Sequence, residues 1–172
     1  MKNIKQIIKE ELNNNEIILL KTFQNKLCDK QKNKATFLYD TILNDNNLNW
    51  FLLKTNKYKN INISYDKGMN FIIWKNGIWI DGIWNDGSWH NGTWINGEWK
   101  TGFWHTGIWY NGIWNSGYWK YGIWNYGEWI DGKWDSGYWL DGKWNKGKIW
   151  NTNLQKYVET KLNPAEYYKI II

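Results

Sequence analysis

The sequence predicts a mainly β protein: a β-solenoid of Gly-x-Trp-x-x pentads with a helical N-terminal cap and a short helical C-terminal tail. Two periodic features predict the solenoid. Tryptophan occupies every fifth position from Trp74 to Trp144, and glycine follows each of these tryptophans three residues later, from Gly77 to Gly147. A short fixed period is typical of a repeat array. The residue before most of these glycines is Asn, Asp, Ser or Thr, which favours a turn in every pentad.

The pentad also indicates which side chains point inward. Every tryptophan from Trp79 to Trp144 has a glycine two residues before it. A close-packed interior has room for an indole where its neighbour lacks a side chain, so we expect the Trp column to face inward. Each buried indole N–H then needs an acceptor. Backbone carbonyl groups at the corners, or the Asn, Ser and Thr side chains there, are the expected acceptors.

Over residues 74–148 these pentads resemble the pentapeptide-repeat family. The resemblance implies a right-handed, four-sided β-helix with four pentads per coil, in which Trp and Gly take the inward positions usually held by Leu or Phe and by Ala. A coil of twenty residues would align Ile83, Phe103 and Ile123 on one outer face. Two alternatives are a three-sided coil of fifteen residues and a meander of short antiparallel strands like that of MORN repeats.

The N-terminal segment, residues 1–47, is expected to be helical. Apolar side chains share one face of a helix over residues 2–12, 16–30 and 35–44. Polar stretches separate these three segments and mark their ends.

Residues 48–73 are interpreted as a strand cap on the first coil. Strand character begins at the apolar run 50–53, and residues 61–65 alternate apolar and polar side chains as a half-buried strand does. Asp66, Lys67 and Gly68 are a turn signal. Repeat arrays need atypical ends that cover their open strands and apolar interior.

The solenoid is expected to span residues 74–150, and residues 151–172 to form a C-terminal capping or docking tail. We expect a helix over 153–162. A second helix start is indicated at 163–166, where Asn, Pro and Glu stand at the cap, first-turn and third positions. The apolar end, 170–172, either packs over the last coil or docks into another subunit.

Charge argues against a nucleic-acid partner. All 22 basic residues are lysine, and arginine supplies the rigid fork that recognises phosphate and guanine. Residues 74–150 carry 7 lysines and 7 acidic residues, whereas residues 1–73 carry 12 lysines and 7 acidic residues. The neutral solenoid also differs from the acidic solenoids by which some pentapeptide-repeat proteins imitate DNA.

The expected localisation follows from sequence features that we do not find. Cys28 is the single cysteine, so no internal disulfide is expected. We expect no signal peptide and no membrane span. These features favour a cytoplasmic or virion-associated protein, and the abundance of Asn, Lys and Ile is typical of a phage or viral source.

Catalytic signals are sparse. His90, His105 and Cys28 have no partner groups in the linear pattern, and most aspartates in the repeat precede glycine as turn residues. We therefore expect no enzymatic activity, no metal site and no cofactor.

The outward position before each Trp carries the candidate interaction surface. It holds large apolar or aromatic side chains, which mark binding sites when they are contiguous. The candidates are Ile83, Phe103, Tyr118, Ile123 and Tyr138. Our first hypothesis is a non-enzymatic structural or protein-interaction module, with a protein partner or self-association. The alternative is a carbohydrate- or nucleotide-binding protein that uses outer aromatic columns. The N-terminal helices or a second chain are expected to cover part of this surface.

Overall fold

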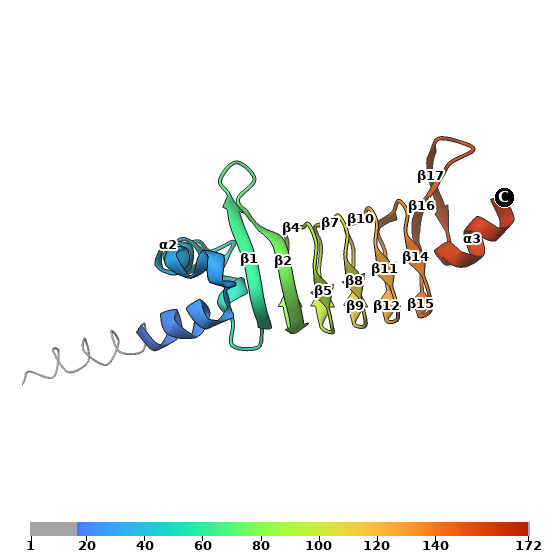
Figure 1. Ribbon diagram of the computed structural model, residues 1–172. Coiled ribbons are helices and arrows are strands. Elements are labelled where there is room, and N and C mark those ends of the chain that lie inside the picture. The colour runs from blue at the N-terminus through green and yellow to red at the C-terminus, as the bar shows by residue number, and fades with distance from the viewer. Residues whose placement is uncertain (1–16, 172) are drawn as a thin grey trace, which may run out of the picture.

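The computed structural model describes residues 17–171, and most of them form a parallel β-solenoid of about five coils (Figure 1). Helical segments lie at the N-terminal end of the solenoid. A hairpin and a short helix lie at its C-terminal end. The mainly β solenoid with helical ends that the sequence predicts is therefore confirmed.

The N-terminal segment is helical in the part that the structure describes. Residues 17–26 are helical, and they precede the 3₁₀ helix η1 (Asp29–Lys34) and helix α2 (Ala35–Leu43). The helix expected over 35–44 is confirmed. The helix expected over 16–30 is shorter than predicted, because the chain passes into η1. The helix expected over 2–12 lies outside the described residues.

The solenoid has a hairpin of longer strands at each end and a regular series of short strands between them. The first hairpin is β1 (Lys57–Asp66) with β2 (Phe71–Asp81), and the last is β16 (Gly147–Asn151) with β17 (Lys156–Thr160). Between them lie thirteen two-residue strands: β3 (Ile83–Trp84), β4 (Ser88–Trp89), β5 (Thr93–Trp94), β6 (Glu98–Trp99), β7 (Phe103–Trp104), β8 (Ile108–Trp109), β9 (Ile113–Trp114), β10 (Tyr118–Trp119), β11 (Ile123–Trp124), β12 (Glu128–Trp129), β13 (Lys133–Trp134), β14 (Tyr138–Trp139) and β15 (Lys143–Trp144).

Each coil contains fifteen residues and three sides, so the expected four-sided coil is wrong. Parallel pairing joins Trp74 to Trp89 and Trp89 to Trp104. The strands form three ladders: β2-β4-β7-β10-β13-β16, β2-β5-β8-β11-β14 and β3-β6-β9-β12-β15. Because an indole is large, three of them meet at the centre of one coil, with ring centroids 5.8–6.3 Å apart. A fourth side would hold the rings farther apart and leave a void.

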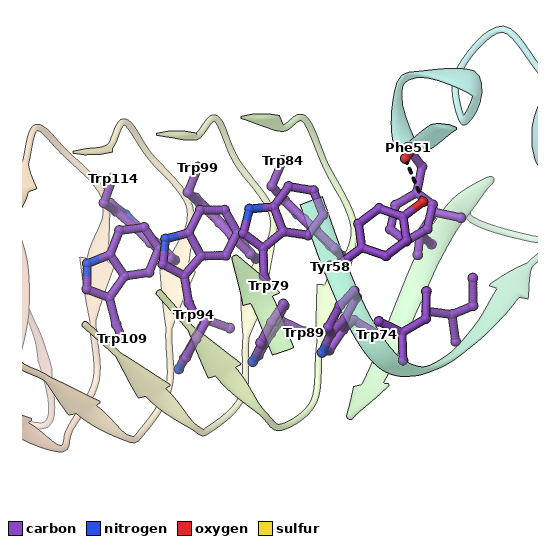
Figure 2. Packing of buried hydrophobic residues seen from close by; sticks show 14 of the residues in the cluster. Phe51, Tyr58, Trp74, Trp79, Trp84, Trp89, Trp94, Trp99, Trp109 and Trp114 are labelled. Carbon is purple, nitrogen blue, oxygen red and sulfur yellow. Dashed lines mark hydrogen bonds between the residues drawn. The ribbon is translucent and has the colours of Figure 1, made fainter. Parts of the chain in front are cut away.

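The Trp side chains fill the interior as three continuous stacks. All fifteen repeat tryptophans are buried, which confirms the predicted inward orientation. Within one stack, successive rings are nearly parallel and their centroids lie 4.6–5.1 Å apart. That separation matches the ~4.8 Å between hydrogen-bonded strands. Figure 2 shows successive layers of these rings. The backbone repeat and the ring stacking therefore reinforce each other.

Glycine makes each corner possible for two reasons. Every glycine from Gly77 to Gly147 has a positive φ, between 115° and 159°. For most of them this is a backbone conformation that L residues rarely adopt, so glycine allows the chain to turn there. Glycines also stack upon glycines. A Cβ on Gly112 would lie 2.3 Å from the carbonyl oxygen of Gly97 in the preceding coil. The sequence predicted the need for turn geometry and for room, but at Gly112 and most other corners the closest obstacle is backbone rather than indole.

Indole N–H groups are only partly satisfied. Trp94, Trp109 and Trp124 each donate to the backbone carbonyl seventeen residues ahead, at 3.1 Å, and Trp144 donates to Thr160. These bonds confirm the corner carbonyls as acceptors. Among the described residues, ten other buried indole nitrogens have no hydrogen-bond partner. The apolar and stacking energy of the interior therefore outweighs an unfavourable polar contribution.

Aromatic residues cover the first coil. The 3₁₀ helix η2 (Asn49–Leu52) replaces the strand character expected for 50–53, and it places Trp50 and Phe51 over the first Trp layer. Tyr58 of β1 stacks on Trp79, with centroids 5.6 Å apart (Figure 2). The buried Asn56 side chain accepts from the backbone N–H of Ile83 and donates to its carbonyl. It thus pairs with the open edge of the third ladder.

The C-terminal hairpin covers the last coil. Ile149 pairs with Trp134 and takes the inward place of the next Trp, so Trp150 turns outward. This exchange explains the one-residue shift in the Trp period. The helix expected over 153–162 is wrong, because residues 156–160 form β17 and pair antiparallel with β16. Pairing with an open edge outweighed the helical spacing of the apolar residues there.

Helix α3 (Pro164–Ile171) completes the C-terminal cap. Asn163 Oδ1 accepts from the Glu166 backbone N–H, and Glu166 accepts from the Asn163 N–H, so the predicted helix start is confirmed. Tyr167 is buried and accepts from Asn151. Tyr168 donates to the carbonyl of Asp135 in the last coils. The tail therefore packs on its own solenoid, while Ile170 stays largely exposed.

Candidate functional site

The outer surface of the solenoid has three long faces, one for each ladder. On every face the outward residues are those immediately before and after the buried Trp. We call the face of the β4-β7-β10-β13-β16 ladder the basic face, that of β5-β8-β11-β14 the apolar face, and that of β6-β9-β12-β15 the mixed face. These faces begin at the pentads of Trp74, Trp79 and Trp84, respectively. The three faces differ in chemistry although their backbones are alike.

The basic face has an excess of lysine that the overall charge of the repeat conceals. Its outward columns carry four lysines and one aspartate: Lys75, Lys120, Lys133, Lys148 and Asp135. Lys133 and Lys148 are register partners in adjacent strands. Within residues 17–171 neither has an ion-pair partner. Like charges side by side are unfavourable.

Aromatic side chains run along the same face. Phe103 is half exposed, and its ring meets that of Tyr118 edge to face, with centroids 6.3 Å apart. Tyr157 of β17 folds back over this face and donates to Asp135 Oδ1 at 3.2 Å. Its ring also meets that of the outward-turned Trp150, at 5.0 Å. Burial, the Tyr118 hydroxyl and the Asp135 carboxylate raise the pKa of Tyr157. We call Phe103, Tyr118, Tyr157 and Trp150 the aromatic strip.

An open groove of about 620 Å³ follows the corner between the mixed and basic faces. Gly102, Gly117 and Gly132 form its floor, since they carry no side chain. One wall is polar and the other is aromatic and basic. The wall residues are Asp86, Thr101, Ser116 and Asp131 on one side, and Phe103, Tyr118, Lys133 and Lys148 on the other.

Both histidines lie on the basic face. The rings of His90 and His105 stand in adjacent coils with centroids 4.7 Å apart, and His105 Nε2 lies 3.1 Å from Ser88 Oγ. Burial, together with the neighbouring His90 and Lys120, lowers the pKa of His105. No carboxylate within residues 17–171 hydrogen-bonds to His105, and Ser88 is buried. The pair therefore lacks the orienting acid of a nucleophilic triad.

The apolar face has no charged residue in its outward columns. Eight of its ten outward side chains are apolar or aromatic. They are Ile78, Thr93, Ile108, Ile123 and Tyr138 before the Trp, and Ile80, Ile95, Tyr110, Asn125 and Leu140 after it. Tyr138 and Leu140 are each more than 60% exposed. This face therefore presents mainly apolar and aromatic side chains to solvent.

The mixed face differs from the basic face in that its charges are paired. Lys143 Nζ lies 2.7 Å from Glu128 Oε1, and Lys100 pairs with Glu98. These lysines lower the pKa of both carboxyl groups. Asn115 and Asn145 donate to the same two glutamates at 3.0 Å. The charged side chains of the mixed face therefore pair with one another.

The five predicted surface residues do not form one stripe. The fifteen-residue coil places Ile83 on the mixed face, Phe103 and Tyr118 on the basic face, and Ile123 and Tyr138 on the apolar face. The alignment of Ile83, Phe103 and Ile123 expected from a twenty-residue coil is wrong. Phe103 and Tyr118 are register partners in adjacent strands, and so are Ile123 and Tyr138.

Sequence reasoning missed Tyr157, Trp150 and the sorting of charge between faces. Reading the chain in steps of fifteen would have placed Lys133 beside Lys148 and Ile108 beside Ile123. The contact between Tyr157 and Asp135 had no periodic signal, because Tyr157 lies outside the repeat.

The described residues contain no group of three or more His, Cys, Asp or Glu side chains placed to hold a metal ion. No helix within residues 17–171 is long and apolar enough to cross a membrane. Comparison with protein-family models, curated proteins and solved structures gave no match to this chain.

Proposed function

We propose that this protein is a non-enzymatic interaction module that binds a protein partner, including a second copy of itself, through the apolar face. The observation that carries the proposal is the uncharged run of outward side chains along the β5-β8-β11-β14 ladder. Both ends of the Trp stacks are covered by the chain's own caps, so the sides of the solenoid are the surfaces available for binding.

The size of the apolar face fits this role. Five coils spaced by ~4.8 Å, each presenting a side of about five residues at ~3.3 Å, give a face of roughly 400 Å². Contiguous apolar patches of this size on soluble proteins often mark interaction sites. The stacked rings behind the face make it rigid, which reduces the entropy lost on binding. A composition rich in Asn, Lys and Ile supports a phage or viral protein that acts in the cytoplasm or on the virion.

Placing charge on the apolar face should weaken association. We expect the double variant Ile108→Lys/Ile123→Lys to raise the dimer dissociation constant at least about tenfold, because two charges per copy would lose water at the interface. Light scattering and sedimentation over a range of concentrations measure it. Ile83→Lys/Ile113→Lys is the matched control, since it makes the same changes at the same pentad position on the mixed face.

Two results would count against this function. One is a wild-type protein that stays monomeric and whose captured proteins are all captured by the Ile108→Lys/Ile123→Lys variant as well. The other is an equal loss of association in the mixed-face control.

A further inference from the structure

The basic face shows features of a binding surface that has no occupant within the chain. On the mixed face each glutamate at the position before Trp is paired with a lysine, at Glu98 and Glu128. On the basic face Lys133 and Lys148 stand side by side, and within residues 17–171 neither forms a salt bridge, although Glu159 of β17 is the register partner of Lys148. Unpaired like charges in register destabilise a ladder. An anionic ligand would offset that cost.

The aromatic strip adds a second, independent feature. Phe103 is 50% exposed, and Tyr118, Tyr157 and Trp150 continue the strip toward the C-terminal hairpin. The hydroxyl group of Tyr157 is held by Asp135, and Lys133 Nζ lies 5.4 Å from the centre of the Tyr157 ring. Tyr157 is thus held in place before any ligand binds, and Phe103 and Tyr118 are followed along the ladder by Lys133 and Lys148.

The corner groove adds groups that recognise hydroxyls. Thr101 and Ser116 line the groove, and Ser116 Oγ donates to the Lys100 carbonyl, which leaves its lone pairs free to accept. Asp131 is paired with Lys146 at 3.1 Å, and Asp86 accepts from the Gly87 N–H at 2.7 Å. Both carboxylates keep further acceptor capacity for hydroxyl donors.

We propose that the corner groove and the adjoining basic face bind an extended acidic glycan, a chain of uronate or sulfated sugars lying along the solenoid axis. Sugar rings have apolar C–H faces that pack on Phe103 and Tyr118, hydroxyls that bond to the polar wall, and acidic groups that complement Lys133 and Lys148. The repeat of the groove, one coil per ~4.8 Å, is close to the length of one pyranose unit. This role goes beyond the protein-binding function and uses a different face.

The polar wall favours a glycan over single-stranded nucleic acid. Asp86 and Asp131 line the groove and can accept from sugar hydroxyls, which each unit of a glycan carries and a deoxyribose backbone lacks. Phe103 and Tyr118 meet edge to face, at 65°, rather than presenting two parallel platforms for successive bases. Arginine, which combines stacking with phosphate binding, is absent from the sequence.

Calorimetric titration with matched ligands tests this proposal. The probes are oligogalacturonate, its fully methyl-esterified neutral form, an alginate oligomer, a sulfated heparin oligomer and oligothymidylate. We expect at least one acidic glycan to bind, to bind more tightly than the neutral chain and oligothymidylate, and to weaken as salt is raised. Phe103→Ala should weaken its binding about fivefold. Lys133→Gln/Lys148→Gln should weaken it about tenfold and reduce the salt dependence.

Control variants separate this site from the rest of the surface. Ile113→Ala and Lys100→Gln/Lys143→Gln make comparable changes on the mixed face and should leave glycan binding unchanged. Near-ultraviolet circular dichroism of the Trp stacks confirms that each variant is folded. Failure of all three acidic glycans to bind, tighter binding of the neutral chain or oligothymidylate, or equal losses in the control variants would overturn the proposal. The Ile108→Lys/Ile123→Lys variant should still bind the glycan, so the two functions fail separately.

Discussion

Gly112→Ala is expected to destabilise the protein by about 2–6 kcal/mol, or to prevent folding, although it adds only one methyl group. Gly112 has a φ of 123°, which an L side chain rarely adopts. Its new Cβ would lie 2.3 Å from the Gly97 oxygen and 3.0 Å from the Gly97 nitrogen. Neither atom can move without shifting the preceding coil. The free energy of unfolding, measured by urea titration of Trp fluorescence, reports the effect.

Gly68→Ala is the matched control for that substitution. Gly68 lies in the β1–β2 turn, and a Cβ there would make an ordinary contact, 3.4 Å from Asp66 Oδ1. Its expected effect is within about 0.5 kcal/mol. If both alanine variants were equally stable, the glycine-on-glycine stacking described for the corners would be incorrect.

Trp109→Ala is expected to cost about 3–5 kcal/mol, the typical loss for a large core side chain. Trp109 is fully buried and lies 4.8 Å from the rings above and below it, those of Trp94 and Trp124. Its indole N–H also donates to the Tyr126 carbonyl at 3.1 Å, and the substitution leaves that carbonyl without this donor. Chemical unfolding and calorimetry measure the loss.

Tyr110→Ala provides the comparison for Trp109. Tyr110 is the next residue, lies on the apolar face and is 46% exposed. We expect its removal to change the free energy of unfolding by less than about 0.5 kcal/mol. A Trp109→Ala protein as stable as the Tyr110→Ala protein would mean that Trp109 is not in the core.

The sequence predicted the solenoid because its signals are local and repeated. The inward Trp, the glycine turn and the capping residues of α3 each depend on a few neighbouring positions, and the structure agrees at all three. The failures concern pairing between distant segments. Residues 50–53 and 156–160 adopted the structure that covers an exposed end of the stacks, rather than the one favoured by their local spacing.

The candidate site was predicted only residue by residue. Phe103, Tyr118, Ile123 and Tyr138 are outward, as expected for the position before Trp, but the number of residues per coil decides which of them are neighbours. That number depends on how many indoles fill the interior. A period of five is compatible with three or four sides, and the volume of the side chains selects three.

The number of residues per coil is the central claim, because every face assignment depends on it. In a Cys28→Ser background, two double-cysteine variants test it: Ile108→Cys/Ile123→Cys and Phe103→Cys/Ile123→Cys. Ile108 and Ile123 are register partners in adjacent strands, whereas Phe103 lies in another ladder. Parallel neighbours stand ~4.8 Å apart, within the Cα range of a disulfide. A fifteen-residue coil predicts an intramolecular cross-link, read by mass spectrometry, in the first variant only; a cross-link in the second variant only would contradict it.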